Sequence, residues 1–493
     1  MLAGWVHTRR DHGGLIFIDL RDQYGITQVR FDPKTDKKAW ERANSLRSEF
    51  VIQATGRVVK RPKAMVNTKL ATGEIELEGR ALTILNEAKT PPFPIDQDSN
   101  VGEDIRLKYR YLDLRRPSIR KKLAFRSDMV VFIRRYLIER GFQEVETPIL
   151  GKSTPEGARD YLVPSRQHPG QFYALPQSPQ QYKQLLMVGG FDKYFQIAPC
   201  FRDEDARADR APDQFYQLVL EMAFVEQKDI LDLMEGLFTE FAKKFTKKKI
   251  LHTPWPRLTY AQAMETYGSD KPDLRFGMEL VDVTELAKQS SFSVFTSAQA
   301  VKGIACPSGA ALSRKDFEDL TEFAKKQGAE GLVWAKIKDG ALGSPVAKFI
   351  DAAIQKKIIQ SLNTKDGDVA FFIAGEPLVV QETLGALRKV LGDRFQLADP
   401  NALAFCYIVD FPLFEERMER GHFAPKHHMF TRPKEEDMSL LDSDPGKARS
   451  WQHDMVLNGA EVAGGSLRIY SADVQEKIFK LIGFDAEHAA QFQ

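Results

Sequence analysis

Residues 196–224, QIAPCFRDEDARADRAPDQFYQLVLEMAF, contain two apolar stretches that are joined by a highly charged loop. This pattern predicts a β-hairpin whose tip begins with Arg202, Asp203 and Glu204. A solvated hairpin tip would explain these charges without any function. However, Phe215 places an aromatic ring beside them, and a guanidinium with an aromatic ring suits a nucleotide, because Arg pairs with phosphate and Phe stacks on a base. The segment therefore predicts a nucleotide site on a rigid hairpin.

The same segment resembles motif 2 of the class II aminoacyl-tRNA synthetases, and its FRDED start is similar to that of the aspartyl-tRNA synthetases. The resemblance implies an ATP-dependent ligation of L-aspartate to tRNA(Asp) through an aspartyl-adenylate. It assigns catalysis to Arg202 and Glu204, and ATP binding to Arg202, Asp203, Glu204 and Phe215. The sequence contains no P-loop or Rossmann glycine pattern and no nucleophile constellation. None is needed, because the carboxylate of the amino acid would itself attack the α-phosphorus of ATP, while Arg202 and Mg²⁺ offset the developing charge.

The composition is that of an ordinary globular protein, with 28% charged and 43% hydrophobic residues. A chain of 493 residues is too long for one hydrophobic core, and its length predicts roughly three domains. The net charge of +2 means that a polyanion would be met by local basic patches. Cys200, Cys306 and Cys406 lie far apart without a C-x-x-C pair, which argues against a disulfide framework and a thiolate zinc site. We expect a cytoplasmic protein without a membrane segment, because the sequence has no membrane-spanning run and no signal-peptide pattern.

Short strands with turn signals fill residues 1–88, which predicts a small β-barrel with a hairpin at Tyr24-Gly25. An aromatic residue on a barrel strand is more often a core residue than a base-stacking one. Residues 4–22, GWVHTRRDHGGLIFIDLRD, nevertheless resemble the anticodon-binding OB-fold of the bacterial-type aspartyl-tRNA synthetases. The resemblance implies that tRNA is contacted by Arg10, His12, Phe17, Gln28 and Glu76.

A proline-rich stretch at residues 89–94 begins a basic hinge or linker, which we expect to extend over residues 89–121. From residue 122 apolar residues recur at helical spacing, with Gly141 placed as a C-cap. Residues 142–148, FQEVETP, then resemble motif 1, the helix, strand and proline of the class II dimer interface. The resemblance implies a homodimer and a first part of the catalytic domain at residues 122–274.

Polar residues between the two motifs predict an amino-acid pocket. An amino-acid substrate needs an acceptor for its ammonium group and a cation for a side-chain carboxylate. The segments at residues 154–160 and 175–183 can supply both, although a mobile loop would explain the first equally well. The resemblance assigns aspartate binding to Glu156, Ser178, Gln180, Lys183, Arg202, His427 and Arg468, with Lys183 and Arg468 on the side-chain carboxylate.

Residues 275–400 form a lysine-richer block of helices and short apolar strands, which resembles the insertion domain of the bacterial-type enzymes. The catalytic domain would then resume at residues 401–493. We expect His427 and His428 on a strand, where adjacent side chains point to opposite faces and do not chelate one metal. Further on, Asp454 and Glu461 are hard oxygen ligands that suit Mg²⁺, although a surface hairpin would also explain them. The resemblance assigns both to the metal and Glu461 also to ATP.

The predicted architecture is an α+β multidomain protein with an N-terminal OB-fold barrel, a class II antiparallel-sheet catalytic domain and an α+β insertion domain. We expect the chain to end before motif 3 of the family. Val219 also stands where the family usually has an Asp that faces the substrate ammonium group. These two departures leave open an alternative, a non-catalytic tRNA- or adenylate-binding paralogue or a truncated fragment. Asparagine is a third interpretation of the substrate, but Lys183 and Arg468 favour a carboxylate.

The tRNA choice rests on two barrel positions. His12 matches the histidine of family members that also charge tRNA(Asn). Ala64 matches neither the glycine of those members nor the lysine of some discriminating ones. Because a small residue leaves room beside the third anticodon base, the sequence favours relaxed specificity, with tRNA(Asn) as a second partner.

Overall fold

The computed structural model describes residues 1–95, 100–153, 158–205, 213–415, 418 and 421–484. The chain divides into two compact units, Met1–Phe132 and Ile133–Gln493. None of the helices in these described residues combines the length and the apolar character that a bilayer crossing requires.

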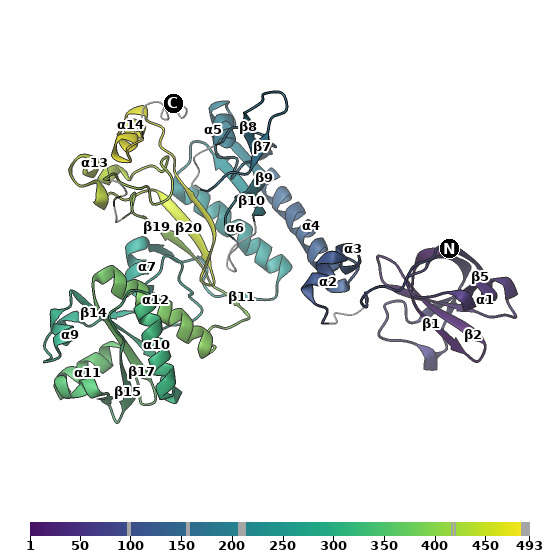
Figure 1. The fold of residues 1–493 in the computed structure, drawn as a ribbon, viewed down its shortest axis with the longest axis horizontal. Helices are drawn as coiled ribbons and strands as arrows, with labels where there is room; N and C mark the ends of the chain where they lie inside the picture. The colour runs from purple at the N-terminus through teal and green to yellow at the C-terminus, as the bar shows by residue number, and fades with distance from the viewer. Residues whose placement is uncertain (96–99, 154–157, 206–212, 416–417, 419–420, 485–493) are drawn as a thin grey trace. The chain divides into compact units, whose positions relative to one another are not determined.

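The first unit contains the predicted barrel, which is closed in the order β1-β2-β3-β5-β4 (Figure 1). Its strands are β1 (Leu2–His12), β2 (Leu15–Arg21), β3 (Ile26–Phe31), β4 (Val51–Lys60) and β5 (Ile75–Asn86). The strands alternate, so that side chains such as Val6, Ile18 and Val29 are fully buried inside the barrel. The hairpin at Tyr24-Gly25 is confirmed, because the Asp22 amide donates to the Gly25 carbonyl at 2.9 Å. The helix α1 (Lys37–Ser45) begins at Asp36, whose side chain accepts from the Ala39 amide.

Basic residues after the barrel form two short helices, α2 (Glu103–Lys108) and α3 (Arg110–Asp113). Arg115, which follows α3, donates to Glu49 at 3.0 Å, and Glu49 also accepts from Arg21. The same Arg115 lies over the Trp5 ring at 4.9 Å. Part of the predicted hinge is therefore fixed to the barrel by a shared carboxylate.

The long helix after the hinge, α4, runs from Pro117 to Ile138 and so starts and ends earlier than the sequence predicts. Proline is favoured at a first helical position, which explains the earlier start. Gly141 has the predicted left-handed conformation, with φ of 83°, and reverses the chain after the helix. The predicted strand at residues 142–148 is shorter than expected, because only β6 (Gln143–Glu144) forms a ladder, parallel to β9 (Lys193–Phe201).

The motif 2 segment forms the predicted hairpin, in which β9 (Lys193–Phe201) pairs along its whole length with β10 (Gln214–Met222). A second sheet has the order β12 (Arg257–Thr259), β19 (Phe405–Val409), β20 (Gln452–Leu457) and β21 (Ala460–Ser466). The strands β10 and β21 each end their sheet. The helix α6 (Gln227–Phe245) packs on the second sheet through Leu231, which shares a core with Trp255 and Phe405.

The lysine-richer block folds around a five-stranded sheet of order β13-β14-β17-β15-β16. These strands are β13 (Val281–Asp282), β14 (Ala300–Cys306), β15 (Val333–Lys338), β16 (Ala341–Gly343) and β17 (Val369–Gly375). The helices α10 (Arg314–Lys326) and α12 (Pro377–Arg394) cover one face, with Phe317 and Leu384 in the core. The helices α8 (Thr284–Ala287), α9 (Ser293–Ser297) and α11 (Ala352–Ser361) cover the other face (Figure 1).

The block is attached closely to the helix α7 (Tyr260–Tyr267), because α12 contacts the chain just after α7. A Cβ atom on Gly385 would collide with the carbonyl group of Gly268. Beside this contact, the buried Arg388 donates to the carbonyl groups of Asp273, Phe276 and Gly277 at 2.7 to 2.9 Å. The remaining helices, α13 (Leu440–Ser443) and α14 (Ala472–Leu481), share a small core with Leu413 and Phe414.

Candidate active site

A cavity of about 1310 Å³ lies between the end strands β10 and β21. Its lining includes eight of the predicted site residues, namely Ser178, Gln180, Lys183, Arg202, Phe215, His427, Glu461 and Arg468. These residues come from the helix α5 (Gln180–Val188), the β9–β10 hairpin, the loop at residues 426–430 and the β21 region. The structure therefore brings together side chains that lie nearly 300 positions apart in the sequence. The predicted Glu156 lies outside the described residues.

The amino-acid end of the cavity contains two cations and one carboxylate. The Lys183 Nζ atom lies 2.7 Å from Glu221 Oε1. Burial opposes the charge on Glu221, but Lys183 and then Arg468 outweigh it and hold the pKa of this carboxyl group below its ordinary value. Arg468 donates to Ser466 Oγ at 2.9 Å and to Gln180 Oε1 at 3.4 Å.

Two donors at this end of the cavity have no partner among the described side chains and backbone groups. The Nε2 atom of Gln180 and the Nε atom of Arg468 are buried without an acceptor. Buried donors are normally satisfied, so a group that accepts hydrogen bonds fits between them. This requirement suits a carboxylate-bearing ligand.

Glu221 is a site residue that the sequence analysis missed. It lies on β10, two positions after Val219 and four after Gln217, and all three line the cavity. The period of two along a strand could have identified it, because Phe215 on the same strand was already predicted. Val219, which is 8% exposed, packs against Ala198 and Cys200 and gives this wall an apolar patch between two polar residues.

The nucleotide end of the cavity contains the predicted guanidinium and aromatic ring. The Cζ atom of Arg202 lies 5.1 Å from the centroid of the Phe215 ring. The Nε atom of Arg202 is buried and has no hydrogen-bond partner in the described part of the chain. Asp203 and Glu204 follow on the hairpin and are exposed, and neither lines the cavity. The hairpin tip from residue 206 to residue 212 lies outside the described residues.

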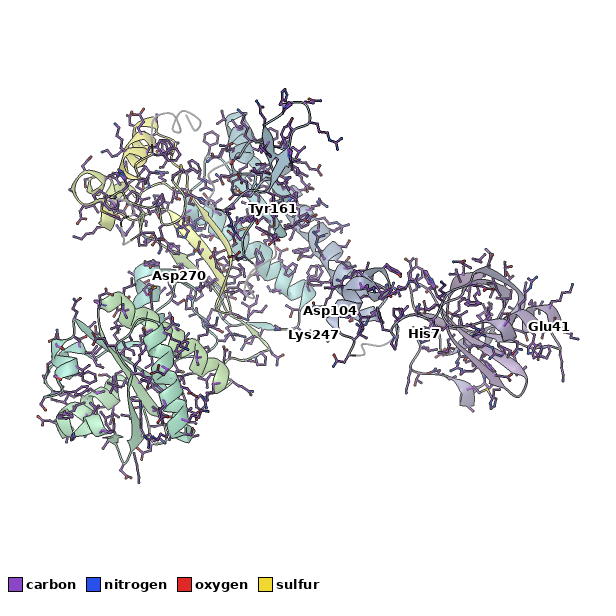
Figure 2. All side chains as sticks on the ribbon, viewed as in Figure 1. His7, Glu41, Asp104, Tyr161, Lys247 and Asp270 are labelled. Carbon is purple, nitrogen blue, oxygen red and sulfur yellow. The ribbon has the colours of Figure 1, made fainter. Side chains whose placement is uncertain are left out.

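The two predicted metal ligands come together at Gly464. A Cβ atom on Gly464 would lie 2.7 Å from Asp454 Oδ1 and 3.5 Å from Glu461 Oε1. Burial and then the charge of Asp454 raise the pKa of the Glu461 carboxyl group above its ordinary value. Two neighbouring charges have smaller and opposite effects on this pKa: Lys271 lowers it and Asp270 raises it. Figure 2 shows Asp270 beside the end of α7.

The donor set at Gly464 fits Mg²⁺, because a divalent cation would relieve the repulsion between two neighbouring carboxylates. Magnesium ions usually take one or two carboxylates together with substrate phosphates. The described residues contain no cluster of three or more His, Cys, Asp and Glu side chains that could hold a metal ion alone. A metal here would therefore depend on oxygen atoms of a ligand.

The expectation that His427 and His428 lie on a strand is wrong. They occupy a loop in which only the flanking Pro425 and Thr431 form isolated bridges. His427 packs edge-on against the Phe411 ring at 4.8 Å, and its Nε2 atom lies 3.7 Å from Asp454 Oδ2. Burial, Arg468 and Lys183 lower the pKa of His428 to about 4, so this side chain is neutral at neutral pH.

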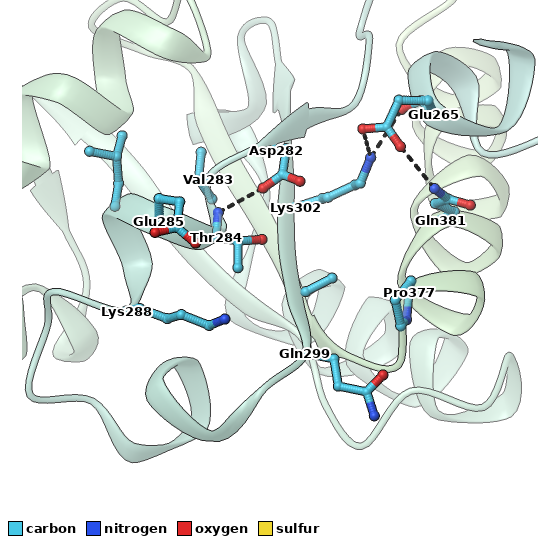
Figure 3. A pocket seen from close by; sticks show the side chains of 12 residues that line it. Glu265, Asp282, Val283, Thr284, Glu285, Lys288, Gln299, Lys302, Pro377 and Gln381 are labelled. Carbon is cyan, nitrogen blue, oxygen red and sulfur yellow. Dashed lines mark hydrogen bonds and ion pairs between the residues drawn. The ribbon is translucent and has the colours of Figure 1, made fainter. Parts of the chain in front are cut away.

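A second cavity, of about 550 Å³, lies between α7 and the inserted block, and none of the predicted site residues lines it. Figure 3 shows its best-connected group, the ion pair of the buried Lys302 with Glu265. The Glu265 carboxylate also accepts from Gln381 Nε2 at 3.0 Å. These contacts satisfy the charges within the protein.

The barrel joins three of its five predicted tRNA-binding residues in one hydrogen-bonded row. Arg10 donates to Gln28 Oε1 at 3.4 Å, and Gln28 donates to Glu76 Oε2 at 2.9 Å. Phe17 is half-buried and pairs across the strands with Arg10 on one side and Arg30 on the other. His12 is exposed at the end of β1.

Comparisons with known proteins agree with both units. Residues 102–493 match the family model described as tRNA synthetases class II (D, K and N), and residues 1–85 match that of the OB-fold nucleic acid binding domain. An aspartate–tRNA(Asp/Asn) ligase of Rubrobacter xylanophilus is 54% identical over 492 residues, which cover 99% of this chain and 82% of that protein. An aspartate–tRNA ligase of Bacillus licheniformis is 51% identical over 497 residues, with 100% and 84% covered.

A solved structure has a similar fold. The asparaginyl-tRNA synthetase of Pyrococcus horikoshii, complexed with asparaginyl-adenylate, aligns with a TM-score of 0.57 at 17% identity over 100% of this chain and 85% of that chain. At this identity the likeness concerns the fold alone. Together with the matched family models and the relatives at about 50% identity, it shows that the chain belongs to the class II tRNA synthetases (D, K and N), among the aspartate–tRNA ligases.

Proposed function

We propose that this chain ligates L-aspartate to tRNA(Asp) in two ATP-dependent steps. In the first, the α-carboxylate of aspartate attacks the α-phosphorus of ATP, and pyrophosphate leaves. In the second, a hydroxyl group of the terminal tRNA ribose attacks the acyl carbon of aspartyl-adenylate, and AMP leaves. The protein contributes positioning and electrostatic stabilisation to both steps.

The charge balance at the amino-acid end of the cavity carries this proposal. Lys183 and Arg468 supply two positive charges, whereas Glu221 supplies one negative charge at a 2.7 Å contact with Lys183. His428 adds no charge, because its pKa is about 4. One positive charge therefore remains for the substrate side chain, which favours the carboxylate of aspartate over the amide of asparagine. We assign Ser178, Gln180, His427 and Glu156 to the remaining aspartate contacts.

The nucleotide end supports the ATP assignment. Arg202 would donate to the α-phosphate through its unpartnered Nε atom, and Phe215 would stack on the adenine. We assign Asp203 and Glu204, which follow Arg202 on the hairpin, to further ATP contacts. Asp454 and Glu461 would hold Mg²⁺, which supplies charge neutralisation on the phosphates when it is bound.

The barrel surface supports an anticodon-binding role. We assign base stacking to Phe17 and base-edge contacts to Gln28 and Glu76, with Arg10 and His12 beside them. Some of the relatives are named as ligases for both tRNA(Asp) and tRNA(Asn), and we include tRNA(Asn) among the acceptors.

We also assign a homodimer to this chain. Large apolar side chains from β6 to α5 are exposed in the single chain, namely Ile149, Leu150, Leu162, Phe172, Leu185 and Val188. An apolar patch of this kind is typical of an interface with a second copy. The proposed parts of the subunit are the barrel (residues 1–88), the hinge (89–121), the two catalytic segments (122–274 and 401–493) and the insertion (275–400). The buried thiols of Cys200, Cys306 and Cys406 suit the cytoplasm.

Aspartylation of tRNA transcripts tests the proposal. The protein is expected to attach radiolabelled aspartate to tRNA(Asp) and to tRNA(Asn), and a variant with Arg202→Ala is expected to attach almost none. A preference for tRNA(Asp) of a hundredfold or more in kcat/KM would contradict the double specificity. The absence of transfer to either tRNA would contradict the ligase function.

A further inference from the structure

A second arginine–aromatic pair lines the active-site cavity and has no role in the scheme above. The Cζ atom of Arg432 lies 4.9 Å from the centroid of the Tyr470 ring. Both residues line the cavity of about 1310 Å³. Tyr470 is 82% exposed, so one side of its ring faces Arg432 while most of its surface remains open to a ligand.

The pair is positioned by backbone contacts that do not require the two side chains. The Arg432 amide donates to the Leu467 carbonyl at 3.0 Å, and the Ile469 amide donates to the Phe430 carbonyl at 2.9 Å. These bonds already join the two segments, so the stacking of Arg432 on Tyr470 is not needed to hold them together. Tyr470 follows Arg468 by two positions, so these backbone bonds also hold Tyr470 near the amino-acid end of the cavity.

The orientation of Arg432 is set by a further network on the same rim. Its guanidinium bonds to the carboxylate of Glu435, and this carboxylate also accepts from Trp451 Nε1 at 2.9 Å. A guanidinium that is fixed in this way loses little freedom when a ligand binds. An exposed and yet pre-ordered pair is more typical of a binding surface than of a structural contact.

The proposed reaction involves two nucleobases, the adenine of ATP and the terminal base of the tRNA. Two arginine–aromatic pairs are found among the described residues that line the cavity. The first pair, Arg202 with Phe215, lies on the β9–β10 hairpin and takes the adenine and phosphate of ATP in the proposed function. The second pair follows β21, beside the arginine that is assigned to aspartate. The terminal tRNA nucleotide must reach the same place, because its ribose hydroxyl attacks the acyl carbon of aspartate.

We propose that Tyr470 and Arg432 bind the 3′-terminal nucleotide of the tRNA, with the base stacked on the Tyr470 ring and a phosphate paired with the Arg432 guanidinium. This assignment rests on the proposed function, since it names a subsite for the tRNA substrate of that reaction. Aromatic stacking and phosphate pairing both tolerate any base, so the pair provides positioning and not sequence choice.

The test compares acyl transfer with aspartate activation in Tyr470→Ala and in its matched control, Tyr470→Phe, which keeps the ring. Preformed aspartyl-adenylate on the enzyme is mixed with tRNA(Asp), and transfer is followed in a single turnover. Tyr470→Ala is expected to slow transfer at least tenfold more than it slows aspartate-dependent exchange of pyrophosphate into ATP. Tyr470→Phe and Arg432→Lys are expected to transfer faster than Tyr470→Ala and Arg432→Gln, respectively.

A tRNA whose terminal ribose lacks its base identifies the group that stacks on Tyr470. With this tRNA, the transfer rate of the unmodified enzyme is expected to fall about tenfold. The transfer rate of Tyr470→Ala is expected to be the same with this tRNA as with unmodified tRNA. Equal losses from base removal in both proteins would overturn the inference, and so would equal losses of transfer and exchange in Tyr470→Ala.

A binding measurement keeps this outcome separate from failure of the proposed function. If the unmodified protein shows no aspartate-dependent exchange, the ligase function itself fails. Fluorescence anisotropy with a labelled RNA hairpin that ends in CCA then still decides the inference. Tighter binding to the unmodified protein than to Tyr470→Ala would support it, and equal binding would overturn it.

Discussion

In the proposed function, selection of aspartate depends on a few charged residues at one end of the cavity. Lys183 is paired with Glu221, and Arg468 lies close enough to Glu221 to help lower the pKa of its carboxyl group. A substrate carboxylate would enter a site that already contains one carboxylate and two cations. Its binding therefore depends on both cations being present.

Removal of either cation should weaken aspartate binding. Lys183→Ala and Arg468→Ala would each leave two carboxylates facing a single cation, at an expected cost of about 2–4 kcal/mol in aspartate affinity. Glu221→Gln is the matched control, because it removes the resident negative charge and should not lower aspartate affinity. Isothermal titration calorimetry with aspartate and, separately, with ATP checks this. Aspartate affinity that is equal in Lys183→Ala, Arg468→Ala and the unmodified protein would rule out their assignment.

The carboxylates of Asp454 and Glu461 should oppose each other until a cation binds. Burial and Asp454 raise the pKa of Glu461 above the ordinary glutamate value of 4.5. As the pH is lowered, protons should therefore begin to compete with Mg²⁺ for Glu461 at a higher pH than they would for an ordinary glutamate. Glu461→Gln removes the repulsion, so it should raise Tm without Mg²⁺ and lower the affinity for Mg²⁺–ATP. Differential scanning calorimetry and nucleotide titrations measure these two effects, and a lower Tm with unchanged nucleotide affinity would refute the assignment.

Residue patterns predicted eight of the described side chains that line this cavity, but not the others. Arg202 and Phe215 could be found because they flank a charged loop, and Gln180 and Lys183 because they start a helix. Glu221 was missed although the period of two from Phe215 could have identified it, because its pairing with Lys183 of α5 leaves no signal in the sequence. His453 was missed for a similar reason. It is buried beside Gln227 of α6, and burial lowers its pKa to about 4, but sequence does not place α6 next to β20.

Among the elements, the barrel strands carry a surface whose order follows from register. Phe17 pairs with Arg10 and Arg30 on its two neighbours, so these three residues share one face of the barrel. The resemblance to an anticodon-binding domain, and not the alternation of the strands, pointed to Arg10 and Phe17 on this face. The hydrogen bonds from Arg10 through Gln28 to Glu76 could not be predicted in the same way, because they depend on the parallel pairing of β3 with β5.

Truncation of Phe17 should affect tRNA and leave aspartate activation intact. The stacking of one base is worth about 1–3 kcal/mol, so Phe17→Ala should raise KM for tRNA(Asp) by about fivefold to a hundredfold. Phe17→Tyr keeps the ring and is the control. Aminoacylation kinetics at varied tRNA concentration measure the effect. The assignment fails if KM is the same in Phe17→Ala and in Phe17→Tyr.

The junction of α7 and α12 should tolerate no side chain at Gly385. A methyl group there would meet the backbone of Gly268, which cannot move aside as a side chain could. Gly385→Ala should therefore cost about 1–3 kcal/mol in the free energy of unfolding. Gly277→Ala is the control, because no atom lies within 4 Å of a Cβ at that position. Urea denaturation measures both variants, and equal stability of the two would contradict this description of the junction.

Within the second unit, two parallel strand pairs join the segments on either side of residues 275–400, and one of these pairs lies in the four-stranded sheet. The strands β11 (Lys249–Ile250) and β12 precede α7 and the block at residues 275–400. They pair in parallel with two strands that follow this block, β18 (Ala402–Leu403) and β19, respectively. The chain thus leaves the sheet and returns to the neighbouring strand position. Composition predicted the inserted block near residues 275–400, but these parallel pairings join residues about 150 positions apart and left no local signal.

Activation of aspartate by this chain is measured by the exchange of labelled pyrophosphate into ATP. Mg²⁺-dependent exchange should require aspartate. Asparagine should support it with a kcat/KM at least a hundredfold lower, because the unmatched positive charge near Lys183 and Arg468 is worth about 2.7 kcal/mol or more to a carboxylate. Exchange that does not depend on aspartate, or that proceeds equally with asparagine, would contradict the account.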